Sequence, residues 1–278
     1  MRTAYLMMHP KREDHTAIAQ QITGILHAHE IAVSTEPWLA DALKGKVAFD
    51  VQSEPDFVIA VGGDGTFLTA VQTAVRRDIP VLGVNIGHIG FLIEINLEQL
   101  PAVCKRLQAG EYTVENRMLL DVLRKGEVVR TALNDAVISR AGYARLITVK
   151  ASIDDDLVAR YMADGLIVST PTGSTGYSLS AGGPIVCPDV ECILLSPVCP
   201  HTLQHRPVVA GASQVITVEL DCEPEQQVQL DVDGQFVCKL DTSECITVKR
   251  SQKTAKLIRF GNESFFHRIK NKLSEWSC

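Results

Sequence analysis

The spacing of apolar residues changes partway along the chain, and this change constrains the fold more than any other feature. In the first third, strand-like runs at residues 4–8 and 57–61 are separated by a helical pattern of apolar residues within 18–26. The alternation continues with an expected helix at 66–75, a strand at 81–84 and a helix at 97–107. Alternating strands and helices predict a parallel sheet covered by helices, with ligands beyond the carboxyl ends of its strands.

From about residue 111 the pattern changes to short runs rich in Val, Ile and Thr, separated by turn residues. The runs lie at 118–123, 136–139, 146–149, 215–220, 228–232 and 246–248. Helical spacing returns near the end of the chain, at Phe265, Phe266, Ile269 and Leu273. We therefore expect an α/β domain at 1–112, a β-rich domain at 113–261, and a C-terminal helix within 262–278 that returns to the first domain.

Composition narrows the range of functions. Hydrophobic residues make up 46% of the 278 residues and charged residues 22%, as in an ordinary globular protein. The net charge of −6 disfavours a broad basic face for nucleic acid or acidic membranes, and no apolar run reaches membrane-spanning length. The first residues lack a signal-peptide layout, and the eight cysteines form no Cys-x-x-Cys pair. We expect a cytoplasmic protein with reduced thiols and neither a nucleic-acid nor a membrane partner.

A glycine-rich turn follows the apolar run at 57–61, with the sequence Gly62-Gly63-Asp64-Gly65-Thr66. Glycines let the backbone come close to a ligand, and a helix that begins here presents free N–H groups to a phosphate. Because a carboxylate repels phosphate, Asp64 indicates another task, either holding a metal ion or taking a proton from an attacking hydroxyl. The alternative is a tight turn in which Asp64 caps a helix that begins near Thr66.

Two further stretches combine glycine with polar residues. Residues 83–92, which include Asn85 and Phe91, follow a strand but match neither the dinucleotide fingerprint nor a Walker A loop, and a simple turn explains them equally well. Residues 164–184 lead from an apolar strand into a long loop dense in Ser, Thr and Gly, with Tyr177 among them. Hydroxyls, small residues and a flat aromatic ring suit a nucleoside better than a metal ion.

Four weaker candidates have ordinary structural explanations. Asn134-Asp135 is typical of a turn, although its side chains could bind a base or a ribose, and Asp233-Gly234-Gln235 is typical of a hairpin turn. The segment 199–205 carries one cysteine and two histidines, but no further ligand has the spacing of a zinc site. The three carboxylates at 154–156 fit a solvated hairpin tip better than a calcium site.

Taken together and in this order, six segments closely resemble the NAD kinase family. They are 62–66, 85–92, 134–135, 164–184, Pro200-His201 with Arg206-Pro207, and 233–235. Diacylglycerol kinases and phosphofructokinases carry similar first motifs, whereas the run 164–184 is far more specific. The resemblance implies a Rossmann-like N-terminal domain and a β-rich, sandwich-like partner domain. It also implies transfer of the γ-phosphoryl group of ATP, or of inorganic polyphosphate, to the 2′-hydroxyl of the adenosine ribose of NAD, which gives NADP.

The resemblance also implies roles for individual residues. Asp64 matches the general base that takes the hydroxyl proton, and Gly65 matches a dinucleotide contact. Magnesium is implied as the divalent cation, with a homo-oligomer, either a dimer or a tetramer. The positions that match nucleotide-binding residues are Gly62, Gly63, Gly65, Thr66, Asn85, Phe91, Asn134, Asp135, Arg145, Asp164, Ser174, Thr175, Gly176, Tyr177, Ser178, Leu179, Ser180 and Gln235.

Three positions depart from the family pattern. Asp135 stands where Glu is usual, so its carboxylate is one methylene shorter and reaches a different hydroxyl or needs a bridging water. Gly176 replaces the usual Ala and removes a methyl group. Met162 stands where some bacterial members carry a basic side chain, so one phosphate contact is missing or comes from Arg160 or another subunit.

Two other functions remain open on the sequence. A lipid kinase shares the glycine turn, although the chain offers no amphipathic basic helix for membrane work. A non-catalytic NADP-binding sensor is compatible with the three departures. Donor preference, acceptance of NADH and feedback by NADP(H) do not follow from the sequence.

Overall fold

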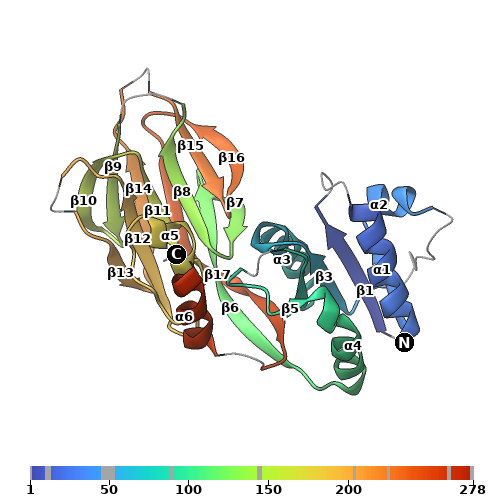
Figure 1. The fold of residues 1–278 in the computed structure, drawn as a ribbon. Coiled ribbons are helices and arrows are strands. Elements are labelled where there is room, and N and C mark those ends of the chain that lie inside the picture. The colour runs from blue at the N-terminus through green and yellow to red at the C-terminus, as the bar shows by residue number, and fades with distance from the viewer. Residues whose placement is uncertain are drawn as a thin grey trace. The chain divides into compact units, whose positions relative to one another are not determined.

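The computed structural model describes residues 2–9, 14–44, 54–87, 90–142, 146–202, 205–223, 226–261 and 264–275. For residues 273–275 it describes the backbone but not the side chains. The chain forms two compact units. The first comprises Met1–Asn116 and Ala255–Cys278, and the second comprises Arg117–Thr254. Figure 1 shows the elements of both units.

The first unit is built on a parallel sheet. Its strands are β1 (Arg2–Met8), β2 (Ile31–Thr35), β3 (Phe57–Val61) and β4 (Val81–Asn85), in the order β2-β1-β3-β4. The short β5 (Ile95–Asn96) and the end of β17 (Cys245–Arg259) also pair with β4 in parallel. Every residue of β3 and β4 is buried, because helices cover both faces of a sheet of this kind.

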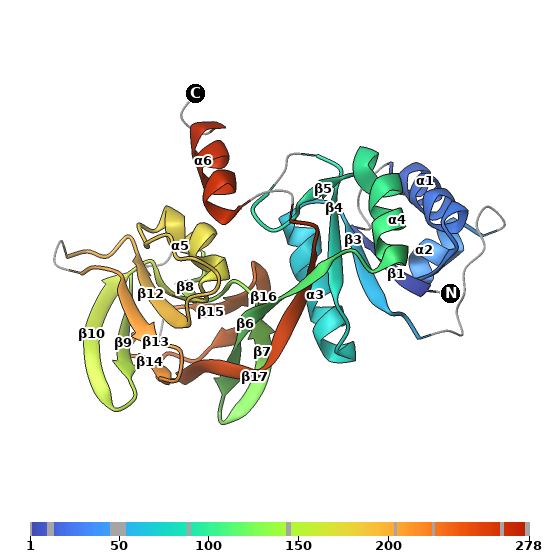
Figure 2. The ribbon, with the colours of Figure 1, turned by 90° about the horizontal axis from the view of Figure 1, so that it is seen from below.

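Helices cover the two faces of this sheet. Figures 1 and 2 show α1 (His15–Ala28) and α4 (Leu100–Ala109) on one face and α3 (Asp64–Arg77) on the other. The core between sheet and helices includes Ile22 and Leu26 from α1 and Leu107 from α4. The remaining helices of this unit are α2 (Pro37–Ala42), the 3-10 turn η1 (Leu97–Gln99) and the C-terminal α6 (Phe265–Glu275).

The second unit is a sandwich of two sheets. One sheet has the order β13-β12-β11-β8-β15-β16, and the other runs β10-β9-β14-β17 and is extended by β6 and β7. Side chains from both sheets form one apolar core, among them Ile138, Val168, Val218 and Val248. The bounds are β6 (Thr113–Arg124), β7 (Glu127–Ala132), β8 (Asp135–Arg140), β9 (Ile147–Ile153), β10 (Asp156–Ala163), β11 (Gly165–Ser169), β12 (Cys192–Val198), β13 (Val208–Gly211), β14 (Ile216–Leu220), β15 (Val228–Val232) and β16 (Gln235–Leu240).

The predicted fold class is confirmed, with a parallel α/β unit, a β-rich unit and a C-terminal helix. Two details of the sequence prediction were wrong. The helix expected at 66–75 begins earlier, at Asp64, and the expected long loop within 164–184 contains the 3-10 turn η2 (Thr172–Thr175) and the short helix α5 (Tyr177–Ser180). No helix in the described ranges is long and apolar enough to cross a membrane.

The apolar stripe expected in the C-terminal helix is only partly correct. Ile269 is buried, but Phe266 is 69% exposed, and the buried face carries Arg268 beside Ile269. The Leu273 side chain lies outside the described residues. A buried arginine on an otherwise polar helix needs partners that offset the free-energy cost of removing its charge from water.

Candidate active site

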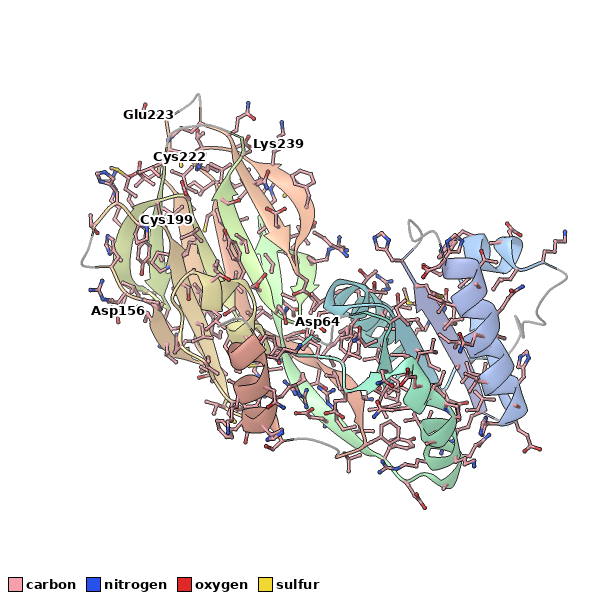
Figure 3. The ribbon with its side chains drawn as sticks, in the orientation of Figure 1. Asp64, Asp156, Cys199, Cys222, Glu223 and Lys239 are labelled. Atoms are coloured by element: carbon pink, nitrogen blue, oxygen red, sulfur yellow. The ribbon has the colours of Figure 1, made fainter. Side chains whose placement is uncertain are left out.

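The glycine turn places Asp64 at the start of α3, directly beyond the carboxyl end of β3 (Figure 3). Gly63 is the N-cap residue and offers no side chain, so the alternative in which Asp64 caps a helix from Thr66 is wrong. Gly62 has a φ of 154°, and a Cβ at this position would lie 2.6 Å from Thr66 Oγ1. The turn therefore requires glycine at 62 and leaves Gly63 and Gly65 exposed for close approach of a ligand.

The Asp64 carboxylate is held by the segment that follows β4. Phe91 N donates to Oδ2 at 2.8 Å, and Leu92 N donates to Oδ1 at a longer 3.4 Å. A Cβ added to Gly90 would overlap all three carboxyl atoms of Asp64. Residue 90 must therefore be glycine, because the backbone passes directly against the carboxylate.

Opposing effects set the protonation of Asp64. Burial is the largest and raises the pKa of the carboxyl above its ordinary value. The two backbone hydrogen bonds, and the positive charges of Lys272 and Arg268, lower the pKa and limit that rise. The result is a half-buried carboxylate with fixed donors, which is a suitable arrangement for a base that must accept a proton and stay oriented.

Asn85 shapes the same segment without pointing its polar atoms outward. Its side chain is 3% exposed, Nδ2 donates to the Gly87 carbonyl at 2.8 Å, and Gly87 N donates to Oδ1 at 3.2 Å. The predicted site residues Gly62, Asp64, Thr66, Asn85 and Phe91 thus belong to one edge of the first unit, where the strands β3 and β4 end.

A second cluster forms in the other unit around Asp233. This residue has a φ of 50° and begins the β15–β16 hairpin turn with Gly234, at a φ of 71°, which confirms the predicted hairpin. Its carboxylate accepts from the backbone N–H groups of Leu133 at 2.9 Å, Asn134 at 2.7 Å and Asp135 at 3.2 Å. The Asn134-Asp135 pair and the Gln235 turn are therefore brought together.

The first part of the hydroxyl-rich stretch packs against the same turn. Thr170 Oγ1 donates to the Leu133 carbonyl at 2.6 Å, and a Cβ added to Gly173 would overlap the Asn134 carbonyl. The Asn134 Oδ1 is buried and has no hydrogen-bond partner in the described part of the chain. An unsatisfied buried acceptor beside two turns marks a place where a ligand donor would be stabilised.

Asp135 lies in the middle of this cluster and is 5% exposed. Burial, and next the negative charge of Asp233, raise its pKa to about 7. A carboxyl group in this state holds a proton near neutral pH and can donate a hydrogen bond as well as accept one. A methyl added to Gly176 would lie 3.9 Å from Asp135 Oδ2 and 3.3 Å from the Gly173 carbonyl.

Most hydroxyls of the stretch 164–184 are used inside the protein. Ser174 exchanges hydrogen bonds with Val186, and the Ser178 hydroxyl lies 2.9 Å from that of Ser196. The Thr175 hydroxyl donates to the Thr172 carbonyl at 3.3 Å. The predicted site residues that remain exposed here are Tyr177 and Ser180, with Gly176 and Leu179 half-buried. The sequence could not tell scaffold hydroxyls from those that remain available to a ligand.

Several predicted positions contribute differently or lie outside the structure. Asp164 forms an ion pair with Arg140, with Nε at 2.5 Å from Oδ1, and Arg145 lies outside the described residues. The ring of His205 packs on Tyr161 at 4.7 Å. No group of three His, Cys, Asp or Glu side chains able to hold a metal occurs in the described ranges.

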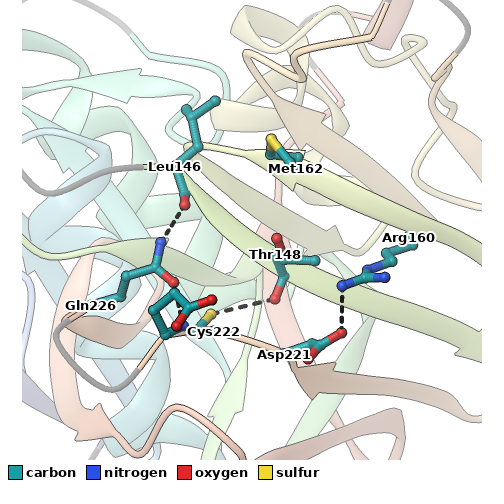
Figure 4. Close-up of a pocket in the computed structure, with 8 residues that line it drawn as sticks. Leu146, Thr148, Arg160, Met162, Asp221, Cys222 and Gln226 are labelled. Atoms are coloured by element: carbon teal, nitrogen blue, oxygen red, sulfur yellow. Dashed lines mark hydrogen bonds and ion pairs between the residues drawn. The ribbon is translucent and has the colours of Figure 1, made fainter.

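A pocket of about 660 Å³ opens in the second unit beside β9 and β10 (Figure 4). Arg160 lines it but is bound to Asp221, with Nη2 at 2.7 Å from Oδ2. Met162 also lines it and is 48% exposed. Cys222 Sγ and Gln226 Nε2 donate to the backbone carbonyls of Thr148 and Leu146 (Figure 4). A ligand phosphate would therefore compete with the Asp221 carboxylate for Arg160 Nη2.

Sequence reasoning missed three residues that build these clusters. Gly90 lies within the stretch 83–92 but was given no role, and Asp233 was given no role of its own beyond the turn and the resemblance. Arg117 was not among the predicted site residues, yet it is 6% exposed and its Nη1 donates to Thr172 Oγ1 of η2 at 3.2 Å. A basic residue within an apolar strand run was the available clue, since such residues are rarely buried without a partner.

Comparison with known proteins identifies the relationship. Residues 15–112 match the model of the ATP-NAD kinase N-terminal domain, and residues 133–260 match that of the C-terminal domain. The NAD kinase of Caldanaerobacter subterraneus subsp. tengcongensis is 44% identical over 235 residues, which cover 83% of each chain. That of Geobacter sp. strain M21 is 39% identical over 267 residues, covering 92% of this chain and 93% of its own.

Solved structures share the fold. The NAD kinase from Archaeoglobus fulgidus in complex with ATP aligns with a TM-score of 0.76 and 28% identity, covering 99% of both chains. Yeast NADH kinase complexed with NADH aligns with a TM-score of 0.88 over 99% of this chain and 88% of its own, at 24% identity. With two domain models matched in order and relatives that align over most of their length, the chain belongs to the NAD kinase family.

Proposed function

We propose that this chain phosphorylates NAD at the 2′-hydroxyl of its adenosine ribose, with ATP as the donor, to give NADP. The observation that carries the proposal is the geometry of Asp64, a single carboxylate held by two backbone donors between exposed glycines at the start of a helix. Phosphoryl transfer depends mainly on positioning and on neutralisation of charge. The glycine turn supplies close backbone approach, and the carboxylate supplies a base.

In this mechanism Asp64 is the general base. Its ionised carboxylate takes the proton of the 2′-hydroxyl as that oxygen forms a bond to the γ-phosphorus of ATP. The bond between the γ-phosphorus and the bridging oxygen breaks at the same time, and ADP leaves with the electron pair. The two backbone bonds leave further lone pairs on both carboxylate oxygens for the substrate.

Magnesium fits the site as an ion that arrives with the phosphates of ATP. Mg²⁺ keeps several waters and is bound through one or two carboxylates plus substrate phosphates. Because Asp64 acts as the base, phosphate oxygens of ATP and water would supply the ligands of the ion here. When bound, the ion neutralises charge on the transferred phosphoryl group.

The second unit supplies groups for the dinucleotide. The buried Asn134 Oδ1 is available to a ligand N–H or hydroxyl donor, and Asp135 can hydrogen-bond a ribose hydroxyl. Exposed Tyr177 offers a flat face for a base. Gln235, which follows the Asp233-Gly234 turn at the start of β16, and Asp164 complete the proposed contacts from described residues. We also propose a cytoplasmic location. The proposed assembly is a dimer or a tetramer, and light scattering on the purified protein measures the number of subunits.

The test is direct product formation. Purified protein is incubated with NAD, magnesium and either ATP or inorganic polyphosphate, and NADP is measured with an NADP-specific dehydrogenase. Asp64→Asn should lower kcat by about 10²–10⁴-fold, because the amide cannot accept the proton, while binding of NAD is retained. Normal turnover in this variant would reject the proposed base.

Two other outcomes separate the alternatives. Tight NADP binding without turnover under any donor would indicate a sensor. Phosphorylation of diacylglycerol in vesicles, without NADP formation, would indicate a lipid kinase.

A further inference from the structure

A buried arginine lies directly behind the segment that holds Asp64. Arg268 of α6 is 8% exposed. Its Nη1 donates to the Phe91 carbonyl at 2.9 Å, and its Nη2 donates to Glu94 Oε1 at 2.9 Å. The guanidinium fork therefore fixes two points of the segment that follows Gly90. A lysine could not replace it, because its ammonium group is a point charge on a flexible chain.

A second arginine supports the same segment. Arg259, at the end of β17, is also 8% exposed, and its Nη1 donates to the Leu92 carbonyl at 2.8 Å. Its Nε lies 2.7 Å from Glu115 Oε2 and 3.4 Å from Glu94 Oε1. Glu94 is thus shared between the two cations, and its charge offsets the cost of burying them.

The contacts of Arg268 continue to Asp64 through one peptide group. The Phe91 carbonyl oxygen, which accepts from Arg268, belongs to the same peptide group as Leu92 N, which donates to Asp64 Oδ1 at 3.4 Å. A cation bound to a carbonyl polarises its peptide group and strengthens the N–H as a donor. The neighbouring Phe91 N donates to Oδ2 at 2.8 Å.

On the basis of the function proposed above, we propose that Arg268 is a positioning residue for phosphoryl transfer. Through the Phe91–Leu92 peptide group it fixes the orientation of the Asp64 carboxylate, so the C-terminal helix takes part in setting the base. Sequence reasoning assigned α6 only a packing stripe, and Arg268 was not among the site residues it predicted.

The charges near Asp64 support this role. The cations that act on its carboxyl are Lys272 and Arg268, both on α6, and each lowers its pKa against the larger effect of burial. Glu94 and Arg259 lie one contact further away, on the far side of the 91–92 backbone. Loss of the Arg268 charge is therefore expected to raise the Asp64 pKa and to move the acidic limb of the kcat–pH profile to higher pH.

The experiment compares three variants. Arg268→Ala removes both the fork and the charge, and Arg268→Lys keeps the charge alone. Arg106→Ala is the matched control, because Arg106 Nη2 donates to the Phe260 carbonyl at 3.1 Å in the same unit without touching residues 91–94. Initial rates of NADP formation give kcat and KM for NAD and ATP across pH, and carbon NMR of labelled aspartate follows the titration of Asp64 without any turnover.

We expect Arg268→Ala to lower kcat on the order of ten- to a hundredfold with little change in either KM. Its acidic limb and its Asp64 titration should both move to higher pH. Arg268→Lys should keep the limb near that of the wild type with an intermediate kcat, and it carries the test if the alanine variant does not fold. Arg106→Ala should leave kcat and the limb unchanged.

Two results would overturn the inference. One is a folded Arg268→Ala variant whose kcat and acidic limb match the wild type. The other is a loss shared equally by Arg106→Ala, which would indicate a structural anchor only. A wild-type protein that makes no NADP would instead overturn the proposed function, and the NMR titration would still report whether Arg268 acts on Asp64.

Discussion

The buried Asp135, beside the charge of Asp233, predicts an unusual dependence of stability on pH. Asp135 is 5% exposed and its pKa is raised to about 7, first by burial and next by the charge of Asp233. The folded protein therefore keeps a proton on Asp135 over a pH range in which the unfolded chain has lost it. Since the folded state binds more protons there, the free energy of unfolding falls as pH rises through this range.

The magnitude follows from the two pKa values. Each pH unit between them lowers the free energy of unfolding by about 1.4 kcal/mol. The pKa of Asp135 rises from the ordinary 3.8 to about 7 in the folded protein. This difference lowers the free energy of unfolding by about 4 kcal/mol, and the full loss is reached above pH 7. Asp135→Asn keeps the shape and removes the titration. Its advantage over the wild type should widen by about 3 kcal/mol from about pH 5 to about pH 8.

The stability of the second unit is measured by urea titration of the wild type and of Asp135→Asn at both pH values. Hydrogen exchange of the β8 amides, followed by mass spectrometry, reports the unfolding of this unit alone. Asp155→Asn in the exposed β9–β10 turn is the matched control, and its difference from the wild type should not change with pH. A constant difference between Asp135→Asn and the wild type at the two pH values would refute the reasoning, because it would mean that Asp135 is ionised without penalty in the folded state.

Two further predictions concern the scaffold of the site. Gly90→Ala should lower kcat about a hundredfold by pushing Asp64 from its donors, whereas Gly87→Ala, whose Cβ meets nothing within 4 Å, should retain activity in the same assay. Arg117→Met should loosen η2 through loss of the hydrogen bond to Thr172. We expect the free energy of unfolding to fall by about 2 kcal/mol, which thermal unfolding measures, and KM for NAD to rise more than kcat falls, which initial rates measure. An unchanged KM would argue against a role of Arg117 in shaping the loop.

The fold was largely predictable because its signals are local. The strands β3 and β15 were predicted with their observed bounds, since short apolar runs between turn residues give little freedom in placement. Short elements were missed, including the five-residue β2 and the six-residue α2, because so few positions carry no clear periodicity. The start of α3 was placed two residues late, because its N-cap residue, Gly63, has no side chain to mark the start of the helix.

The sequence indicates residues of the candidate site only where they are contiguous in the chain. Asp64 stood out as a charge among glycines, and the stretch 164–184 stood out by its composition. The partners of these segments come from distant positions, as when Arg268 binds the carbonyl of Phe91 across 177 residues of sequence. Such pairings depend on topology, so no spacing rule in one sequence reveals them.

Burial raises the pKa of both Asp64 and Asp135, but the groups around the two carboxyls differ, and from this difference we propose different roles for them. Asp64 receives two backbone donors and the field of two cations, whereas Asp135 faces the charge of Asp233. The backbone N–H of Asp135 is one of those that donate to the Asp233 carboxylate and stabilise its charge. We therefore expect Asp64 to be ionised and ready to accept a proton while Asp135 still holds one and donates to a ribose oxygen. Environments that separate two carboxyl groups in this way assign base and donor roles within one enzyme.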